Sequence, residues 1–138
     1  MLNRLRKINL KKAGICSAVV GSINIIVHLF VIFQMIPYTW VNGGRTESLI
    51  AATELSIWSI LITLINITIA IVASQIIPIK FNKIFGMALS IFLIITLPLS
   101  FIGVIQQLLG TMFEKTVMSV ITIVGFCSDT RIAFEKRW

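Results

Sequence analysis

Four long stretches of apolar residues alternate with short polar segments along the chain. They cover approximately residues 13–36, 49–78, 85–109 and 112–134. A helix needs roughly 20 apolar residues to cross a hydrocarbon core about 30 Å thick, and each stretch is long enough or nearly so. Because unpaired backbone groups are prohibitive in lipid, and no ten-residue segments of alternating polarity suggest a β-barrel, the pattern predicts four transmembrane α-helices.

The polar segments between these stretches are too short to hold a separate domain. Successive helices joined by short connections are antiparallel neighbours. We therefore predict a single all-α membrane domain over residues 1–138, an up-down bundle of four transmembrane helices arranged as two hairpins. The two halves show no convincing repeat, so symmetry of the inverted-repeat kind would have to come from a homodimer.

Composition and charge agree with a membrane protein. The chain has 138 residues, of which 57% are hydrophobic and 12% charged, and its mean hydropathy is +1.00. Its net charge of +7 comes from Lys and Arg residues that flank the apolar stretches. Only Arg45 and Lys115 fall at the opposite ends of the helices from the others, so the positive-inside rule predicts that both termini are cytoplasmic. We expect the bacterial cytoplasmic membrane, with lipid and not nucleic acid as the partner of the basic segments.

Small and polar residues recur at helical spacing in the first three stretches. The first row is Ser17, Gly21, Asn24 and His28; the second is Ser59, Thr63, Asn66 and Ala70; the third is Thr96, Ser100, Gly103, Gln107 and Gly110. Spacings of three and four place each row on one helix face. Such rows are typical of contacts between membrane helices, so we expect each row to face the interior of the bundle.

Glu54 is the most informative single residue, because it lies about five residues inside the second stretch. A carboxylate facing lipid is costly, so we expect Glu54 to turn inward and find a partner. The hypothesis is a polar pocket open to the outside, with Glu54 at its centre, Arg45 as counter-ion and His28 at its floor. Its remaining candidates are Asn24, Gln34, Gln106 and Gln107. The alternative is that these residues only tie the loop to the bundle.

Other kinds of chemistry have little support in the sequence. One histidine and scattered carboxylates do not form a metal-ligand pattern, and no nucleophile motif occurs, so we predict no metal and no cofactor and favour a protein that is not an enzyme. Cys16 and Cys127 are expected to be free thiols. Arg131 and Glu135 are four residues apart and can pair on the surface of the last helix.

Three short motifs resemble those of a group of uncharacterised small bacterial four-helix membrane proteins. They are IPYTWVNGGR at residues 36–45, TMFEK at 111–115 and RIAFEK at 131–136. The resemblance implies a four-helix fold and a membrane location, and it implies no activity.

Three functions remain open at this point. The first is binding or translocation of a small molecule or ion through the outward-facing pocket. The second is an interaction protein, such as an immunity-type subunit of a membrane complex, which acts on a membrane partner through its helix faces. The third is an intramembrane enzyme that uses His28 and Glu54 for acid-base chemistry.

Overall fold

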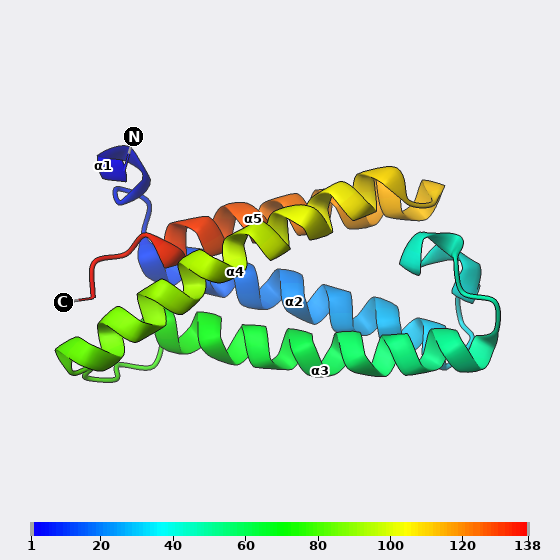
Figure 1. Cartoon of the computed structure of the whole chain (residues 1–138), viewed down its shortest axis with the longest axis horizontal. Coiled ribbons are helices and arrows are strands. Elements are labelled where there is room, and N and C mark those ends of the chain that lie inside the picture. Colours follow the sequence, from blue (N-terminus) through cyan, green and yellow to red (C-terminus); the bar gives the residue numbers. More distant parts are fainter. Residues whose placement is uncertain (1, 138) are drawn as a thin grey trace.

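The computed structural model describes residues 2–137, and all of its regular elements are helical (Figure 1). A short helix α1 (Leu2–Leu5) precedes α2 (Leu10–Ile32), α3 (Leu49–Ala73) and α4 (Lys83–Leu109). A π-helical turn, Glu114–Met118, runs directly into α5 (Ser119–Ala133), and two 3-10 turns, Tyr38–Trp40 and Asn42–Gly44, lie between α2 and α3. Four helices, counting Glu114–Ala133 as one, are long and apolar enough to cross a membrane. The all-helical class predicted from the sequence is confirmed.

Capping side chains explain where three of the long helices begin. Asn9, Ser48 and Asn82 each accept a hydrogen bond from the backbone N–H three residues further on, which satisfies one of the free donors of the first turn. At the other end of α2, Gln34 adopts a left-handed conformation with φ of 57°. The Met35 N–H then bonds to the Phe30 carbonyl, so α2 ends before Pro37.

The long helices pack as two hairpins that meet along one side only. Helix α2 packs against α3 and α5, and α4 packs against α5, whereas α3 and α4 make at most marginal contact (Figure 1). The predicted hairpins are present, but the four helices do not close into a ring. We call the uncovered side between α3 and α4 the seam.

Helices α2 and α3 approach closely because small residues face each other. A Cβ atom at Gly14 would collide with the Ser74 side chain, and one at Gly21 would lie 2.7 Å from Ile67. The close approach also allows hydrogen bonds between the helices: Asn24 Nδ2 donates to Thr63 Oγ1 over 3.0 Å, and His28 Nδ1 lies 3.1 Å from Ser56 Oγ. Small residues and interhelical hydrogen bonds are the usual means by which membrane helices associate.

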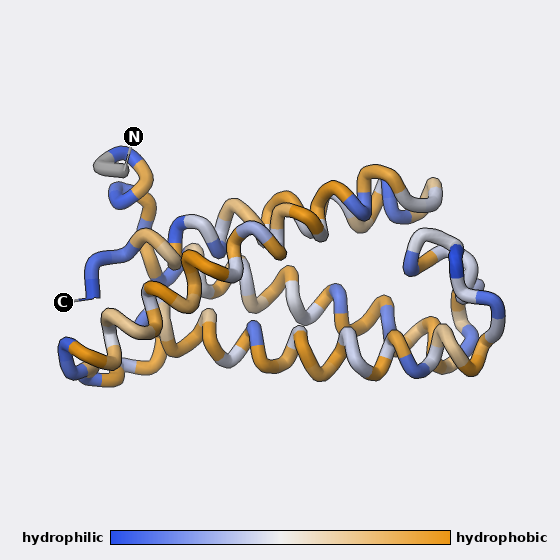
Figure 2. The backbone as a smooth tube through the Cα atoms, in the orientation of Figure 1, coloured by the Kyte–Doolittle hydropathy of each residue, from blue (hydrophilic) through white to orange (hydrophobic). Residues whose placement is uncertain are grey.

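Buried apolar side chains form two small clusters, one at each end of the molecule. The first contains Val27, Val31, Val41, Ala52 and Met118. The second contains Ala13, Ala70, Ala73 and Ile132. We call the end that carries residues 33–48 the loop end, and the end that carries both termini the terminal end. Figure 2 shows hydrophilic segments concentrated at these two ends, with largely hydrophobic helices between them.

Glu114 holds the loop end together. Gly43 N–H donates to both carboxylate oxygens over 3.0 Å, and Thr111 N–H donates to Oε2 over 2.8 Å. Thr111 Oγ1 in turn accepts from Glu114 N–H over 3.3 Å and donates to the Trp40 carbonyl over 2.5 Å. Residues 111–114 thus form a capping box, whose glutamate also binds the loop. Gly43 has φ of 70°, a left-handed conformation that turns its N–H toward this carboxylate.

Arginines hold the terminal end together. Arg131 Nε donates to the Ile8 carbonyl over 2.8 Å, and its Nη1 pairs with Glu135 over 2.6 Å. The spacing predicted this pair, but Arg131 is buried and not on the helix surface. Arg137 Nη1 donates to Ser90 Oγ over 2.9 Å, and Nη2 donates to the Ala73 carbonyl over 3.2 Å. Arg137 therefore joins the C-terminal segment to the end of α3 and to α4. Burial lowers the pKa of Arg137 from its usual value, and the charge of Glu135 opposes this shift.

We expect Glu114→Gln to lower the free energy of unfolding by about 2 to 4 kcal/mol, because a neutral amide has only one acceptor oxygen for the two backbone N–H groups and loses the charge that strengthens both hydrogen bonds. Chemical denaturation of the protein in detergent micelles measures this change. Glu47→Gln removes the same charge from an exposed side chain of the same loop and should have almost no effect. Equal stability of the two variants would contradict the role given to Glu114.

Arg137→Lys should lower the free energy of unfolding by about 1 to 3 kcal/mol, because one ammonium group cannot reach acceptors on separate segments as the guanidinium fork does. The same denaturation measures it. The neighbouring Lys136 is exposed, so Lys136→Ala is the control and should leave stability unchanged. If Lys136→Ala lowered the free energy of unfolding and Arg137→Lys did not, Arg137 would not be the residue that holds these segments together.

Candidate functional site

A cavity of about 590 Å³ lies between the two hairpins. Side chains of all four long helices line it, together with Val41 and Asn42 of the loop. Small-molecule sites commonly have volumes of roughly 300 to 1,000 Å³, so this space is large enough for a ligand. We call it the central cavity.

The wall of the central cavity is polar for a space between apolar helices. Its polar side chains are Ser17, Asn24, His28, Asn42, Ser59, Thr63, Asn66, Ser100, Gln106, Gln107, Glu114, Thr122 and Asp129. The residues of α2 and α3 in this set belong to the rows predicted to face inward, and Ser100, Gly103 and Gln107 place the row of α4 on the same cavity. The inward orientation of these three rows is confirmed, although α4 faces a cavity and not another helix.

Asp129 also lines this cavity, and one of its carboxylate oxygens has no hydrogen-bond partner in the described residues. Its Oδ1 accepts a hydrogen bond from Ser17 Oγ over 2.7 Å, which ties α5 to α2. Within residues 2–137, no Lys, Arg or His nitrogen lies within 4.0 Å of it, since Arg131 and Glu135 form the one ion pair described there. A carboxylate in a membrane helix normally has a cationic partner or a function. Asp129 is therefore the candidate residue of this cavity for binding a positive charge.

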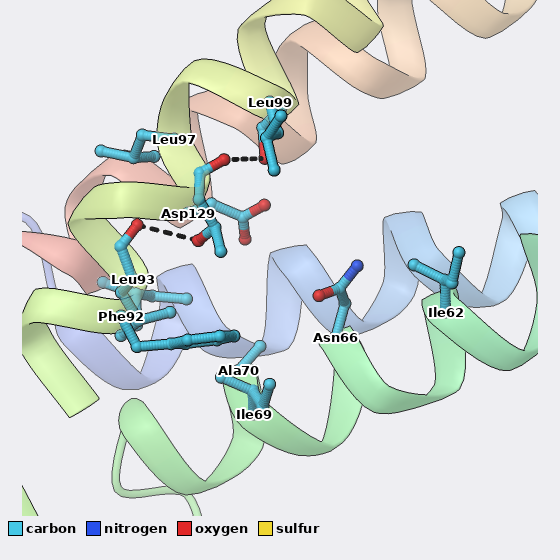
Figure 3. A pocket seen from close by; sticks show the side chains of 12 residues that line it. Ile62, Asn66, Ile69, Ala70, Phe92, Leu93, Leu97, Leu99 and Asp129 are labelled. Carbon is cyan, nitrogen blue, oxygen red and sulfur yellow. Dashed lines mark hydrogen bonds between the residues drawn. The ribbon is translucent and has the colours of Figure 1, made fainter. Parts of the chain in front are cut away.

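A second cavity of about 350 Å³ lies between α3 and α4, next to the first. Figure 3 shows Ile62, Asn66, Ile69 and Ala70 of α3 on one side and side chains of α4 on the other, with Asp129 between them. The two cavities share Ile62, Asn66, Leu99, Ser100 and Asp129. They are therefore neighbouring parts of one space that reaches the seam, and we call the second one the seam cavity.

Two half-buried amide side chains at the loop end of the central cavity each have one buried atom without a partner. Asn42 Nδ2 and Gln107 Oε1 have no hydrogen-bond partner among residues 2–137, and both residues line the cavity. Buried polar atoms are nearly always paired. By contrast, both carboxylate oxygens of Glu114 already accept backbone hydrogen bonds. A polar ligand at this end would meet the two amides, while Glu114 acts as a structural group.

The structure places four of the seven candidate residues predicted from the sequence on the central cavity and three outside it. Asn24, His28, Gln106 and Gln107 line the central cavity, whereas Glu54, Arg45 and Gln34 do not. All three of the latter are exposed. Whether the first four bind a ligand stays a prediction.

The expected inward orientation of Glu54 is wrong. Ala52 and Ser56, two residues before and after it, are fully buried. A helix turns about 100° per residue, so a side chain midway between two inward-facing ones points outward. Glu54 lies near the loop end of α3. In a membrane this position would be close to the bilayer surface, where an exposed carboxylate costs less than at the bilayer centre.

The expected ion pair of Arg45 is also absent from the described part of the chain. Neither Glu54 nor Glu47 lies within 4.0 Å of its guanidinium group. The loop binds its anion through the backbone of Gly43, and the carboxylate comes from Glu114 in the last helix. The Arg45 side chain is left exposed.

Sequence reasoning missed Asp129 and Glu114 as cavity residues. A signal for Glu114 was available, because Thr-x-x-Glu before an apolar run is a capping box. Asp129 had one too: it lies four residues after Gly125 and seven after Thr122, the spacing of one helix face. In residues 2–137, no three His, Cys, Asp or Glu side chains are grouped to hold a metal ion, and Cys16 and Cys127 are free.

Models of known protein families, curated proteins and solved structures were compared with the chain, and none of them matches it. The resemblance carried by the three short motifs thus stays a prediction. The motifs do make contacts in the fold: Gly43 of the first binds Glu114 of the second, and Arg131 of the third binds the N-terminal segment.

Proposed function

We propose that this chain is a multi-pass protein of a bacterial cytoplasmic membrane that binds a small cationic solute in the central cavity and moves it across the membrane. The observation that carries the proposal is Asp129, a half-buried carboxylate that lines the central cavity and has no cationic partner in the described residues. The membrane part rests on four long apolar helices whose surface exposes large side chains such as Ile65, Ile95 and Leu99. Such an extended apolar surface suits lipid and not water.

The distribution of charge supports an orientation. The basic residues around the start of α2, between α3 and α4, and around the end of α5 all belong to the terminal end, while Arg45 and Lys115 belong to the loop end. The positive-inside rule then favours a cytoplasmic terminal end.

The length of the central cavity supports movement of the solute across the membrane and not only its binding. Its wall includes Glu114 at the start of the last helix and Asp129 near the end of that helix. At ~1.5 Å per residue these two positions are roughly 20 Å apart along the helix axis, a large part of a hydrocarbon core about 30 Å thick. A solute could thus pass from the unpartnered amides of the loop end to the carboxylate near the terminal end.

The topology can be checked by labelling single cysteines in a Cys16→Ser/Cys127→Ser background. Glu47→Cys, at the loop end, should react with a membrane-impermeant maleimide in intact cells. Lys136→Cys, at the terminal end, should react only after the cells are permeabilised. Both replaced side chains are exposed. The opposite pattern would overturn the orientation.

Transport can be checked by currents on a solid-supported membrane with purified protein in lipid vesicles and a panel of guanidinium, methylammonium, tetramethylammonium and tetraphenylphosphonium. Wild-type protein should give a current with at least one of these cations. Asp129→Asn should reduce that current at least about tenfold, since a tenfold change corresponds to about 1.4 kcal/mol, a modest value for a desolvated charge pair.

Two variants serve as controls for this measurement. Glu54→Gln makes the same kind of change at an exposed carboxylate outside the cavity and should keep the current. Ser17→Ala removes the hydrogen bond to Asp129 but keeps its charge, so it reports the effect of loosening the contact between α2 and α5. No current with any cation, or equal currents from wild type and Asp129→Asn, would contradict the proposal.

A further inference from the structure

The seam is the place where the cavities approach the surface of the protein. Helices α3 and α4 make at most marginal contact, although both belong to the same four-helix fold. Ile62, Phe92 and Leu99 line the seam cavity and are 56%, 48% and 67% exposed. These helices form the membrane-spanning part of the protein in the proposed function, so the exposed mouth of the seam faces hydrocarbon and not water.

The lining of the seam cavity combines two kinds of chemistry. Its walls are mostly apolar, with Ile69, Leu93 and Leu97 beside the exposed residues named above. One ionisable group, Asp129, lies among them (Figure 3), and the same side chain lines the central cavity. A ligand that fits this wall has a bulky apolar body and one positive charge.

We infer that the solute is an amphiphilic organic cation that enters sideways from the membrane between α3 and α4, with its apolar body in the seam cavity and its charge at Asp129. The inference rests on the proposed function and adds to it the substrate class and the route of entry. Charge complementarity selects this occupant over the phosphate group of a lipid, which a carboxylate repels. The cation exchanges hydrocarbon for apolar side chains at little cost and gains a counter-charge in a medium of low dielectric constant.

The route requires that the seam is in contact with lipid. Phe92→Trp places a fluorophore at the mouth of the seam. The added fluorescence is the difference between the variant and the wild type, which has only the native tryptophans. It is measured in vesicles whose lipids carry bromine on the acyl chains. Quenching of the added fluorescence by more than about half is expected, with partial recovery on adding tetraphenylphosphonium. Added fluorescence that bromine leaves unquenched would show that a second copy or another protein covers the seam, and would overturn sideways entry.

The substrate class requires that apolar bulk strengthens binding. Isothermal titration of the protein in lipid nanodiscs should give a dissociation constant for tetraphenylphosphonium at least tenfold below that for tetramethylammonium, after subtraction of partitioning into protein-free nanodiscs. Asp129→Asn should weaken tetraphenylphosphonium binding at least tenfold. Phe92→Ala should weaken it about threefold to tenfold and leave tetramethylammonium unchanged. Phe85→Ala is the matched control, because Phe85 is an exposed residue of α4 that lines neither cavity.

The outcomes separate this inference from the proposed function. If tetramethylammonium or guanidinium binds in an Asp129-dependent way and tetraphenylphosphonium binds no better, the inference fails and the proposed function stands. If none of these cations binds, both fail. If tetraphenylphosphonium binds wild type and Asp129→Asn equally well, the carboxylate is not its partner, and the inference is overturned.

Discussion

A polar side chain on a long apolar helix is most stable when it turns inward and finds its partner in the protein, and the rest of this structure depends on that constraint. It turns the small and polar rows of α2, α3 and α4 inward. Between α2 and α3 the rows satisfy each other, as in the pairs Asn24–Thr63 and His28–Ser56. Helix α4 makes at most marginal contact with α3, so the small and polar row of α4 lines a cavity and does not pack against another helix.

Strong polar contacts at the two ends of the fold explain how the middle can stay open. Glu114 binds backbone groups of the loop and of its own helix start, and Arg137 binds α4 and the end of α3. A small apolar cluster accompanies each set of contacts. Hydrogen bonds to charged groups are among the stronger contacts in proteins. The two hairpins are thus joined at both ends of the fold, and the central cavity lies between them.

His28 and Glu54 show which side-chain orientations could be predicted from the sequence and which could not. The face of α2 that holds Asn24 and His28 was correctly placed, because their spacing and that of Ser17 and Gly21 leave one orientation that keeps them from lipid. The inward orientation of Glu54 was predicted only from the free-energy cost of a carboxylate that faces lipid. The buried neighbours Ala52 and Ser56 set the phase of α3 instead, and an exposed carboxylate is tolerable near a helix end.

The sequence by itself determined four long apolar helices, their hairpin order and the polar rows that turn inward, since these follow from local periodicity and from the lengths of the apolar stretches and of the segments between them. It also contained the capping box of residues 111–114 and the Arg131–Glu135 pair, which involve residues three or four positions apart in the sequence. Only the tertiary structure decided that Glu114 binds Gly43, that Asp129 meets Ser17, and that α3 and α4 stay apart. These facts depend on which side chains meet across distant parts of the chain, and a pattern within a single helix carries no information about that.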